Sequence, residues 1–132
     1  MIVLDTHVWV WWVSGAEPLP RKVKTALDQH RKDGTIRVSS ISVWEVAQLV
    51  ARGRLKLTMD VEDWIAKSEV IPFLGFVPVD NRIAVRSTRL PGTLHSDPAD
   101  RIIIATALEH RLVVLTPDTL ITRYPDVETE WT

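Results

Sequence analysis

The sequence predicts an α/β sandwich in which helices cover both faces of a parallel sheet. Short apolar runs alternate with longer segments of helical periodicity along the chain. The segment at residues 98–110 is apolar nearly all round, as expected for a central helix. Its 132 residues, 45% of them hydrophobic, contain no repeat or linker-like tract. We therefore expect one domain over residues 1–132, with a core that needs no metal or disulfide.

The first half of the chain alternates between the two kinds of segment. Strands are expected at residues 1–4 and 36–39, and helices after Asp5 and at residues 18–33, 42–53 and 61–68. The second helix opens with proline and ends at Asp33-Gly34, the third ends at Gly53, and the fourth stops before Pro72.

The second half continues the alternation and closes the predicted sheet. A run at 76–79 is followed by a helix-like stretch at 80–90, by the helix at 98–110 and by a β-branched run at 112–115. Ligands of such sheets bind beyond the carboxyl ends of the strands. Asp5 and Asp118 are both expected at that edge.

Acidic residues gather at this edge in the predicted fold. The candidates are Asp5, Glu45, Asp97, Asp100 and Asp118. Each one alone also fits a helix cap, including a capping box formed by Ser42 and Glu45. Their joint placement favours chemistry, because Glu45 and Asp100 are expected in the first turns of helices that begin at the same edge. Carboxylates that converge in this way repel one another unless a cation is bound.

Hard oxygen ligands of this kind suit Mg²⁺ or Mn²⁺, and such a site next to basic residues suits phosphodiester hydrolysis. Asp5, Glu45, Asp100 and Asp118 are the expected catalytic residues and metal ligands. Asp100 is favoured over Asp97 as a ligand, since Asp97 precedes Pro98 and fits a helix cap. Asp97 stays an additional candidate ligand.

Polar and basic residues near the acids are candidate substrate contacts. Residues 21–56 carry nine Lys or Arg against three Asp or Glu, although the whole chain has a net charge of −1. Arg52, Arg54 and Lys56 follow the helix that carries Glu45, and they are expected to bind the nucleic-acid backbone. Thr6 and Thr116 are expected to orient a water molecule. Arg101 is expected either to position a substrate phosphate or to pair with an acid.

The chain contains six tryptophans, more than a core of this size is expected to bury. Trp9, Trp12, Trp44 and Trp64 are expected to form an exposed apolar surface that binds a protein partner. Stacking of bases on these rings is the competing use, but the first helix has no basic residue beside its tryptophans.

Four stretches in order carry a family resemblance: residues 2–9, 39–47, 97–107 and 115–118. Through them the chain resembles the PIN-domain (PilT N-terminal) nucleases, and within these the VapC-type ribonuclease toxins of prokaryotic toxin–antitoxin pairs. The resemblance implies a PIN-like three-layer α/β/α sandwich with a central parallel five-stranded sheet. It places the family's four acids on Asp5, Glu45, Asp100 and Asp118.

The resemblance also implies an activity and partners. The implied activity is that of a Mg²⁺- or Mn²⁺-dependent endoribonuclease that hydrolyses phosphodiester bonds of single-stranded or loop RNA. The implied partners are a second copy of the chain and a cognate antitoxin, whose C-terminal segment lies across a groove near the acids.

Several alternatives remain at this point. One is a non-catalytic PIN-like module that binds protein, and another is a nuclease that acts on DNA. A phosphatase or phosphoacceptor domain is less favoured, because Asp5-Thr6-His7 has no second aspartate two residues on. The absence of cysteine fits a cytoplasmic location, and the longest apolar run, residues 8–13, is too short for a membrane span.

Overall fold

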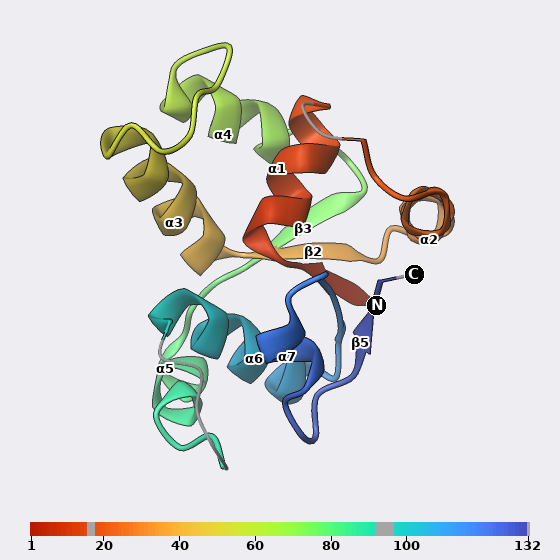
Figure 1. Cartoon of the computed structure of the whole chain (residues 1–132), viewed down its shortest axis with the longest axis vertical. Helices are drawn as coiled ribbons and strands as arrows, with labels where there is room; N and C mark the ends of the chain where they lie inside the picture. Colours follow the sequence, from red (N-terminus) through yellow and green to blue (C-terminus); the bar gives the residue numbers. More distant parts are fainter. Residues whose placement is uncertain (16–17, 92–96, 132) are drawn as a thin grey trace.

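A parallel five-stranded sheet forms the centre of the molecule (Figure 1). The computed structural model describes residues 1–15, 18–91 and 97–131. The strands are β1 (Ile2–Leu4), β2 (Ile36–Ser39), β3 (Leu74–Val77), β4 (Val113–Leu115) and β5 (Thr129–Glu130), in the order β3-β2-β1-β4-β5. The predicted parallel α/β architecture is therefore confirmed.

Helices cover both faces of this sheet (Figure 1). They are α1 (Thr6–Ser14), α2 (Arg21–Asp33), α3 (Ser40–Ala51), α4 (Val61–Glu69), α5 (Asn81–Ser87), α6 (Pro98–His110) and α7 (Thr119–Thr122). Alternate residues of β1 point to opposite faces, as the pleat requires. Ile2 and Leu4 pack with α1 to α4, whereas Val3 packs with α6 and α7. None of the helices in the described ranges is both long and apolar enough to cross a membrane.

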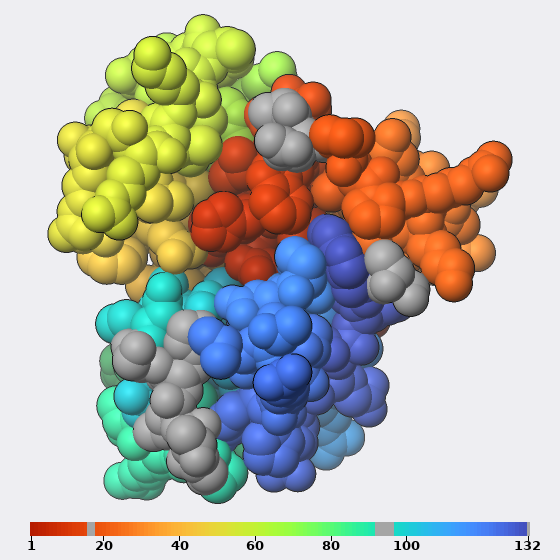
Figure 2. Space-filling view, viewed as in Figure 1, coloured from red at the N-terminus to blue at the C-terminus, as the bar shows by residue number. Residues whose placement is uncertain are grey.

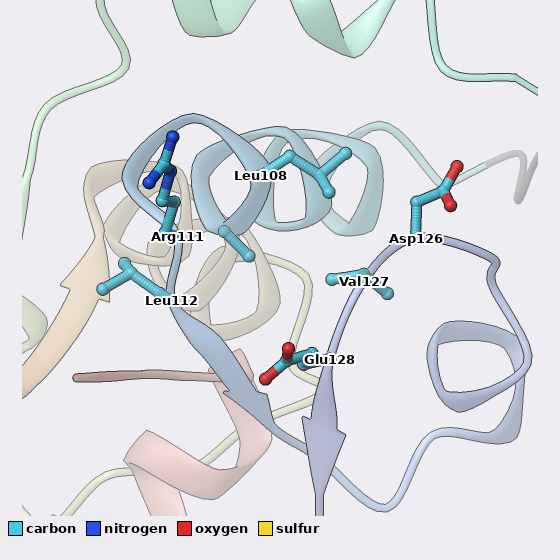
Figure 3. A pocket seen from close by; sticks show the side chains of 7 residues that line it. Leu108, Arg111, Leu112, Asp126, Val127 and Glu128 are labelled. Carbon is cyan, nitrogen blue, oxygen red and sulfur yellow. The ribbon is translucent and has the colours of Figure 1, made fainter.

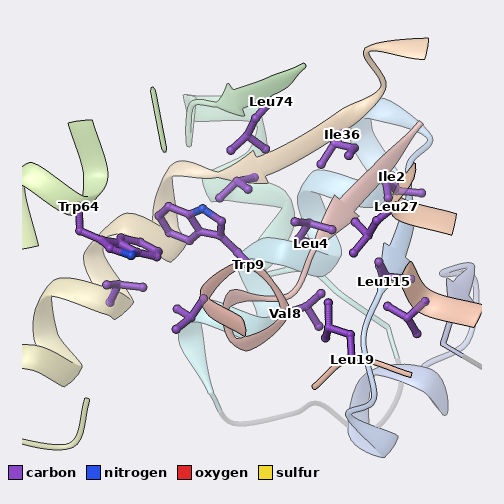
Figure 4. Packing of buried hydrophobic residues seen from close by; sticks show 14 residues of the cluster. Ile2, Leu4, Val8, Trp9, Leu19, Leu27, Ile36, Trp64, Leu74 and Leu115 are labelled. Carbon is purple, nitrogen blue, oxygen red and sulfur yellow. The ribbon is translucent and has the colours of Figure 1, made fainter. Parts of the chain in front are cut away.

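Two of the tryptophans assigned to an exposed surface lie in the core instead (Figure 4). Trp9 is 0% exposed and Trp64 is 3% exposed. Their ring centroids are 4.8 Å apart, and Trp9 also meets Phe76 edge-on at 5.7 Å. The assignment of Trp9 and Trp64 to a partner-binding surface is wrong, because α1 and α4 pack these two rings against each other on one face of the sheet.

The limits of several elements differ from the prediction for local reasons. Helix α3 begins at Ser40 because the Ser39 hydroxyl accepts a hydrogen bond from Ile41 N and caps the helix. The capping box assigned to Ser42 and Glu45 is therefore wrong, and Glu45 lies in the second turn of α3. Strand β3 begins two residues earlier than the predicted run. The apolar runs of the sequence do not predict strand β5.

Candidate active site

The chain changes direction across the sheet between β1 and β4, which are neighbours in the sheet. From β1 the chain continues through β2 to β3 on one side, whereas β4 and β5 lie on the other side. Such a switch point leaves a crevice at the carboxyl ends of the strands, where ligands of open α/β sheets bind. Asp5 directly follows β1, and Asp118 is three residues past the end of β4. Both acids therefore lie at the switch point.

A threonine joins the two segments that leave β1 and β4. The Thr116 hydroxyl donates a 2.6 Å hydrogen bond to Asp5 Oδ2. Its oxygen, Thr116 Oγ1, also accepts a 3.0 Å hydrogen bond from Asp118 N. Asp5 and Thr116 are buried. Asp5 occupies the N-cap position of α1, as the sequence predicts, but its carboxylate is bonded to Thr116 rather than by a side-chain cap of α1. Thr116 instead fixes the orientation of the Asp5 carboxylate.

A buried pair of hydroxyls joins α1 to α3. Thr6 Oγ1 and Ser42 Oγ are 2.7 Å apart, and both residues are 0% exposed. Burial raises the pKa of Glu45, while a hydrogen bond from Thr6 acts in the opposite direction. Since a hydroxyl has one proton, a Thr6 that donates to Glu45 must accept from Ser42. The pair thereby positions Glu45 relative to α1.

The start of α6 carries the two aspartates of the third acidic stretch. Asp97 Oδ1 accepts hydrogen bonds from Ala99 N at 2.8 Å and from Asp100 N at 3.3 Å. Asp97 is thus the N-cap of α6, as the sequence predicts, and Asp100 lies buried in the first turn. The predicted cap is also confirmed for Asp118, whose Oδ1 accepts a 2.9 Å bond from Leu120 N at the start of α7.

Asp100 is surrounded by the other acids. Burial raises its pKa to about 8, with further contributions from the negative charges of Asp97, Asp5, Asp118 and Glu45 in that order. Burial also raises the pKa of Asp5, against the opposing effects of its bond from Thr116 and the charge of His7. The structure therefore brings all five predicted acids into one electrostatic cluster.

The donor chemistry of this cluster fits a hard divalent cation, because carboxylates that repel one another lose that repulsion when a cation is bound. Among the described residues, no three Asp, Glu or His side chains are arranged as a ready-made metal cage. Mg²⁺ does not require such a cage, since it keeps several waters and binds through one or two carboxylates together with substrate phosphates.

A pocket of about 200 Å³ lies between α3 and the start of α6, and Figure 2 shows the notch between the gold surface of α3 and the cyan surface of α6. Glu45 and Asp97 line it together with Arg52 and Arg54. Two of the three predicted backbone contacts therefore lie beside the acids. Lys56 is exposed in the loop that follows α3, outside the lining of this pocket.

Arg101 makes a contact within the fold. Its Nε donates a 3.2 Å hydrogen bond to the carbonyl oxygen of Ser87 at the end of α5. This bond joins α5 to α6, as do the ion pairs that Arg82 and Arg86 form with Glu109 at 3.2 and 2.8 Å. The Arg101 guanidinium thus donates to the backbone of α5 in this hydrogen bond, and not to an acid.

A second, largely apolar pocket of about 210 Å³ lies between α1 and the end of α3. Its walls include His7, Trp11, Leu49 and Leu55, and Arg54 lines both pockets. Trp12 is half-buried against Phe73 at a centroid distance of 5.7 Å, whereas Trp44 is 50% exposed.

A further cavity, of about 260 Å³, lies at the opposite edge of the sheet (Figure 3). It is lined by the end of α6 and by the segment that enters β5, including Leu108, Arg111 and Asp126. Because the strands are parallel, their amino ends lie away from the acids. This cavity is separate from the candidate site.

Two contributors to the site were not assigned from the sequence. Ser42 was interpreted as a helix cap, and only the preceding Ser39-Ser40 pair hints that the helix begins earlier. His7, whose charge lowers the pKa of Asp5 and Glu45, follows Asp5 by two residues. His7 lies near Glu45 because α1 packs against α3, and a single sequence does not reveal this packing.

Comparisons with known proteins identify the family of the chain. The family model described as PIN domain matches residues 2–127. Ribonuclease VapC22 from Mycobacterium tuberculosis is 32% identical over 133 residues, which cover 98% of each chain.

Solved structures share the fold. FitAcB from Neisseria gonorrhoeae is 26% identical, with a TM-score of 0.66 and coverage of 98% of this chain and 96% of that chain. VapBC2 from Rickettsia felis, bound to a DNA fragment from its promoter, has a TM-score of 0.72, with complete coverage of both chains. At 20% identity, that second likeness concerns the fold alone.

The parallel sheet with helices on both faces defines an α/β sandwich protein with acidic side chains at its switch point. With the family match over nearly the whole chain, the protein belongs to the PIN-domain family, in its VapC-type branch.

Proposed function

We propose that the protein is a metal-dependent endoribonuclease that acts as the toxin of a toxin–antitoxin pair. The observation that carries this proposal is the buried Asp100, whose pKa is raised to about 8 among four other acids at the switch point of the sheet. The name of its relative, Ribonuclease VapC22, supports RNA as the substrate.

The side chains of this site have distinct proposed roles. Thr116 holds the Asp5 carboxylate in one orientation through its 2.6 Å bond. Arg52 and Arg54 bind the phosphates of a strand that enters the pocket between α3 and α6. Glu45 lines that pocket, and its raised pKa makes one of its Oε atoms a suitable acceptor for the proton of an attacking water.

The metal ligands are proposed to be Asp5 and Asp100, with Glu45 and Asp118 and with Asp97 as an additional candidate. A Mg²⁺ or Mn²⁺ ion held by these carboxylates would supply Lewis-acid chemistry for the hydrolysis of the phosphodiester. The proposed roles of Thr6 and Arg101 are positional: Thr6 acts through its bond to Glu45, and Arg101 holds α6 against α5.

The test is cleavage of single-stranded RNA by the purified chain in Mg²⁺ or Mn²⁺, beside an EDTA control and the Asp100→Asn variant. Cleavage that requires both the ion and the Asp100 carboxylate is expected. Activity that survives in Asp100→Asn, while EDTA leaves it unchanged, would contradict the proposal. A single-stranded DNA of matched sequence tests whether the substrate is RNA or DNA.

The proposed partners are a cognate antitoxin and a second copy of the chain. The apolar pocket between α1 and the end of α3 supports the antitoxin, because it lies beside Thr6 and offers Trp11 and Leu55 to an apolar side chain. An antitoxin segment seated there also meets Arg54, which borders the substrate pocket. Binding of the antitoxin is then expected to inhibit cleavage by competition with RNA.

A further inference from the structure

Trp44 differs from the other tryptophans in its surroundings. Each of the other five has an aromatic ring partner, at centroid distances from 4.8 to 6.4 Å. Within the part of the chain that the structure describes, Trp44 has no such partner and is 50% exposed. Half of the Trp44 side chain is therefore accessible to a group from outside the fold.

Trp44 lines the same pocket as two of the acids and the two arginines. The wall that contains Trp44 also includes Gln48, which lies one turn further along α3. Arg52 and Arg54 continue this wall after the helix. Glu45 and Asp97 complete the lining on the side of the acids. The pocket therefore combines an aromatic ring, cationic groups and carboxylates within about 200 Å³.

This combination matches the parts of a nucleotide. An unpaired base stacks on an aromatic ring, whereas its phosphates pair with guanidinium groups. Two arginines line the pocket of Trp44, whereas the pockets lined by Trp11 and Trp12 each contain a single Lys or Arg, either Arg54 or Lys24. A protein partner would not need the arginines and the catalytic acids to share this wall.

We propose that Trp44 is a substrate-binding residue that stacks on an unpaired base next to the cleaved phosphodiester, with Arg52 and Arg54 on the neighbouring phosphates. This inference rests on the proposed ribonuclease function and specifies its substrate: a strand whose base is free to leave a duplex. A base within a helix cannot reach the ring, so cleavage is restricted to single-stranded or looped segments.

The experiment measures binding of a fluorescein-labelled single-stranded RNA 12-mer by fluorescence anisotropy in EDTA, which prevents the metal-dependent cleavage. Trp44→Ala is expected to weaken binding roughly 10-fold, and Trp44→Phe to retain most of the affinity because the ring remains. The matched control is Val85→Ala, which shortens an apolar side chain of similar exposure, 48%, on α5. Its affinity is expected to equal that of the wild type.

Two further measurements separate stacking from a general loss of structure. The loss in Trp44→Ala is expected to be the same factor at about 50 and about 200 mM salt, because no charge is removed. When single bases of the RNA are removed in turn, removal at one position is expected to weaken binding to the wild type. The same removal should leave the affinity of Trp44→Ala unchanged.

The following results would overturn the inference. Trp44→Ala that binds RNA within twofold of the wild type, while the wild type still cuts it, rejects stacking and leaves the nuclease proposal standing. Unchanged RNA binding combined with a smaller molar mass by light scattering assigns Trp44 to contact with a second copy. A wild-type chain that neither binds nor cuts RNA or total tRNA rejects the proposed function itself.

Discussion

Thr116 and Asp5 form a hydrogen bond on which the site's geometry depends. The donor and acceptor are both buried, and the Thr116 oxygen also accepts from Asp118 N. One hydroxyl thereby holds the segments that follow two neighbouring strands. A buried carboxylate that loses the Thr116 donor becomes harder to ionise, because burial already raises its pKa.

Thr116→Val is therefore expected to lower RNA cleavage at least about 10-fold and to cost about 1–3 kcal/mol in the free energy of unfolding. Single-turnover cleavage and urea unfolding measure the two effects. The control is Thr106→Val, which removes another buried hydroxyl, one that donates to Ile102 O within α6. If both variants lose activity equally, the loss reflects stability rather than the bond to Asp5.

Asp100 makes the stability of the metal-free protein depend on pH. Its pKa is raised from 3.8 to about 8, so the folded chain retains a proton that the unfolded chain releases between these values. This contribution to stability is full below pH 3.8 and declines as the pH rises to about 8. The Asp100→Asn variant does not titrate there and escapes the decline.

The expected result is a melting temperature of Asp100→Asn that exceeds the wild type's by several degrees near pH 8 in EDTA, with the difference vanishing toward pH 4. Thermal melts over this range measure it. Asp63→Asn, at an exposed acid on α4, is the control and should show no such trend. A constant difference across the range would mean that Asp100 is ionised in the folded protein without a cation.

At the scale of elements, α6 carries both a cap and a candidate ligand in its first turn. Asp97 Oδ1 bonds Ala99 N and Asp100 N, so the cap also sets the position of the Asp100 backbone. The two roles of Asp97 can be separated, because asparagine caps a helix about as well as aspartate but lacks the charge.

If Asp97 acts only as the cap, Asp97→Asn is expected to retain nearly all of the stability and most of the activity. Asp97→Ala should lower the free energy of unfolding by about 1 kcal/mol and should slow cleavage because Asp100 is displaced. Urea unfolding and cleavage rates distinguish the two variants. Asp60→Ala removes the equivalent cap of α4 and controls for capping away from the acids. An inactive but stable Asp97→Asn would make Asp97 a ligand.

The elements differ in how well the sequence predicted them. Helix α6 was predicted with both ends correct, because Pro98 and the apolar periodicity mark it clearly. The start of α3 was wrong, because Ser39 and Ser42 are equally good caps from sequence, and packing of Ser42 against Thr6 decides between them. The two-residue β5 has too few residues to show a pattern.

At the scale of the whole molecule, the site depends on strand order. The alternation of segments predicts a parallel sheet, and parallel strands predict that Asp5 and Asp118 share an edge. That β1 and β4 are adjacent is not encoded in any local pattern, and only the structure reveals it. The burial of Trp9 against Trp64 likewise depends on the pairing of α1 with α4.

The uneven charge of the chain predicts how RNA binding responds to salt. Arg52→Gln and Arg54→Gln are each expected to weaken RNA binding and to reduce the slope of log affinity against log salt by about 0.7. Anisotropy titrations at several salt concentrations measure the slope. Arg21→Gln is the control, since Arg21 is exposed at the start of α2 within the same basic block but outside the pocket. Equal slopes for all three variants would indicate diffuse attraction rather than contact in the pocket.

The acids at the switch point are proposed to hold a divalent cation, a claim that isothermal titration of the wild type with Mn²⁺ near pH 7 can test. We expect Mn²⁺ binding to release a proton from Asp100 and to weaken at least about 10-fold in Asp100→Asn. The affinity for Mn²⁺ should be unchanged in Glu109→Gln, because Glu109 lies on α6 in ion pairs with Arg82 and Arg86. No detectable binding, or equal binding by Asp100→Asn, would contradict the claim.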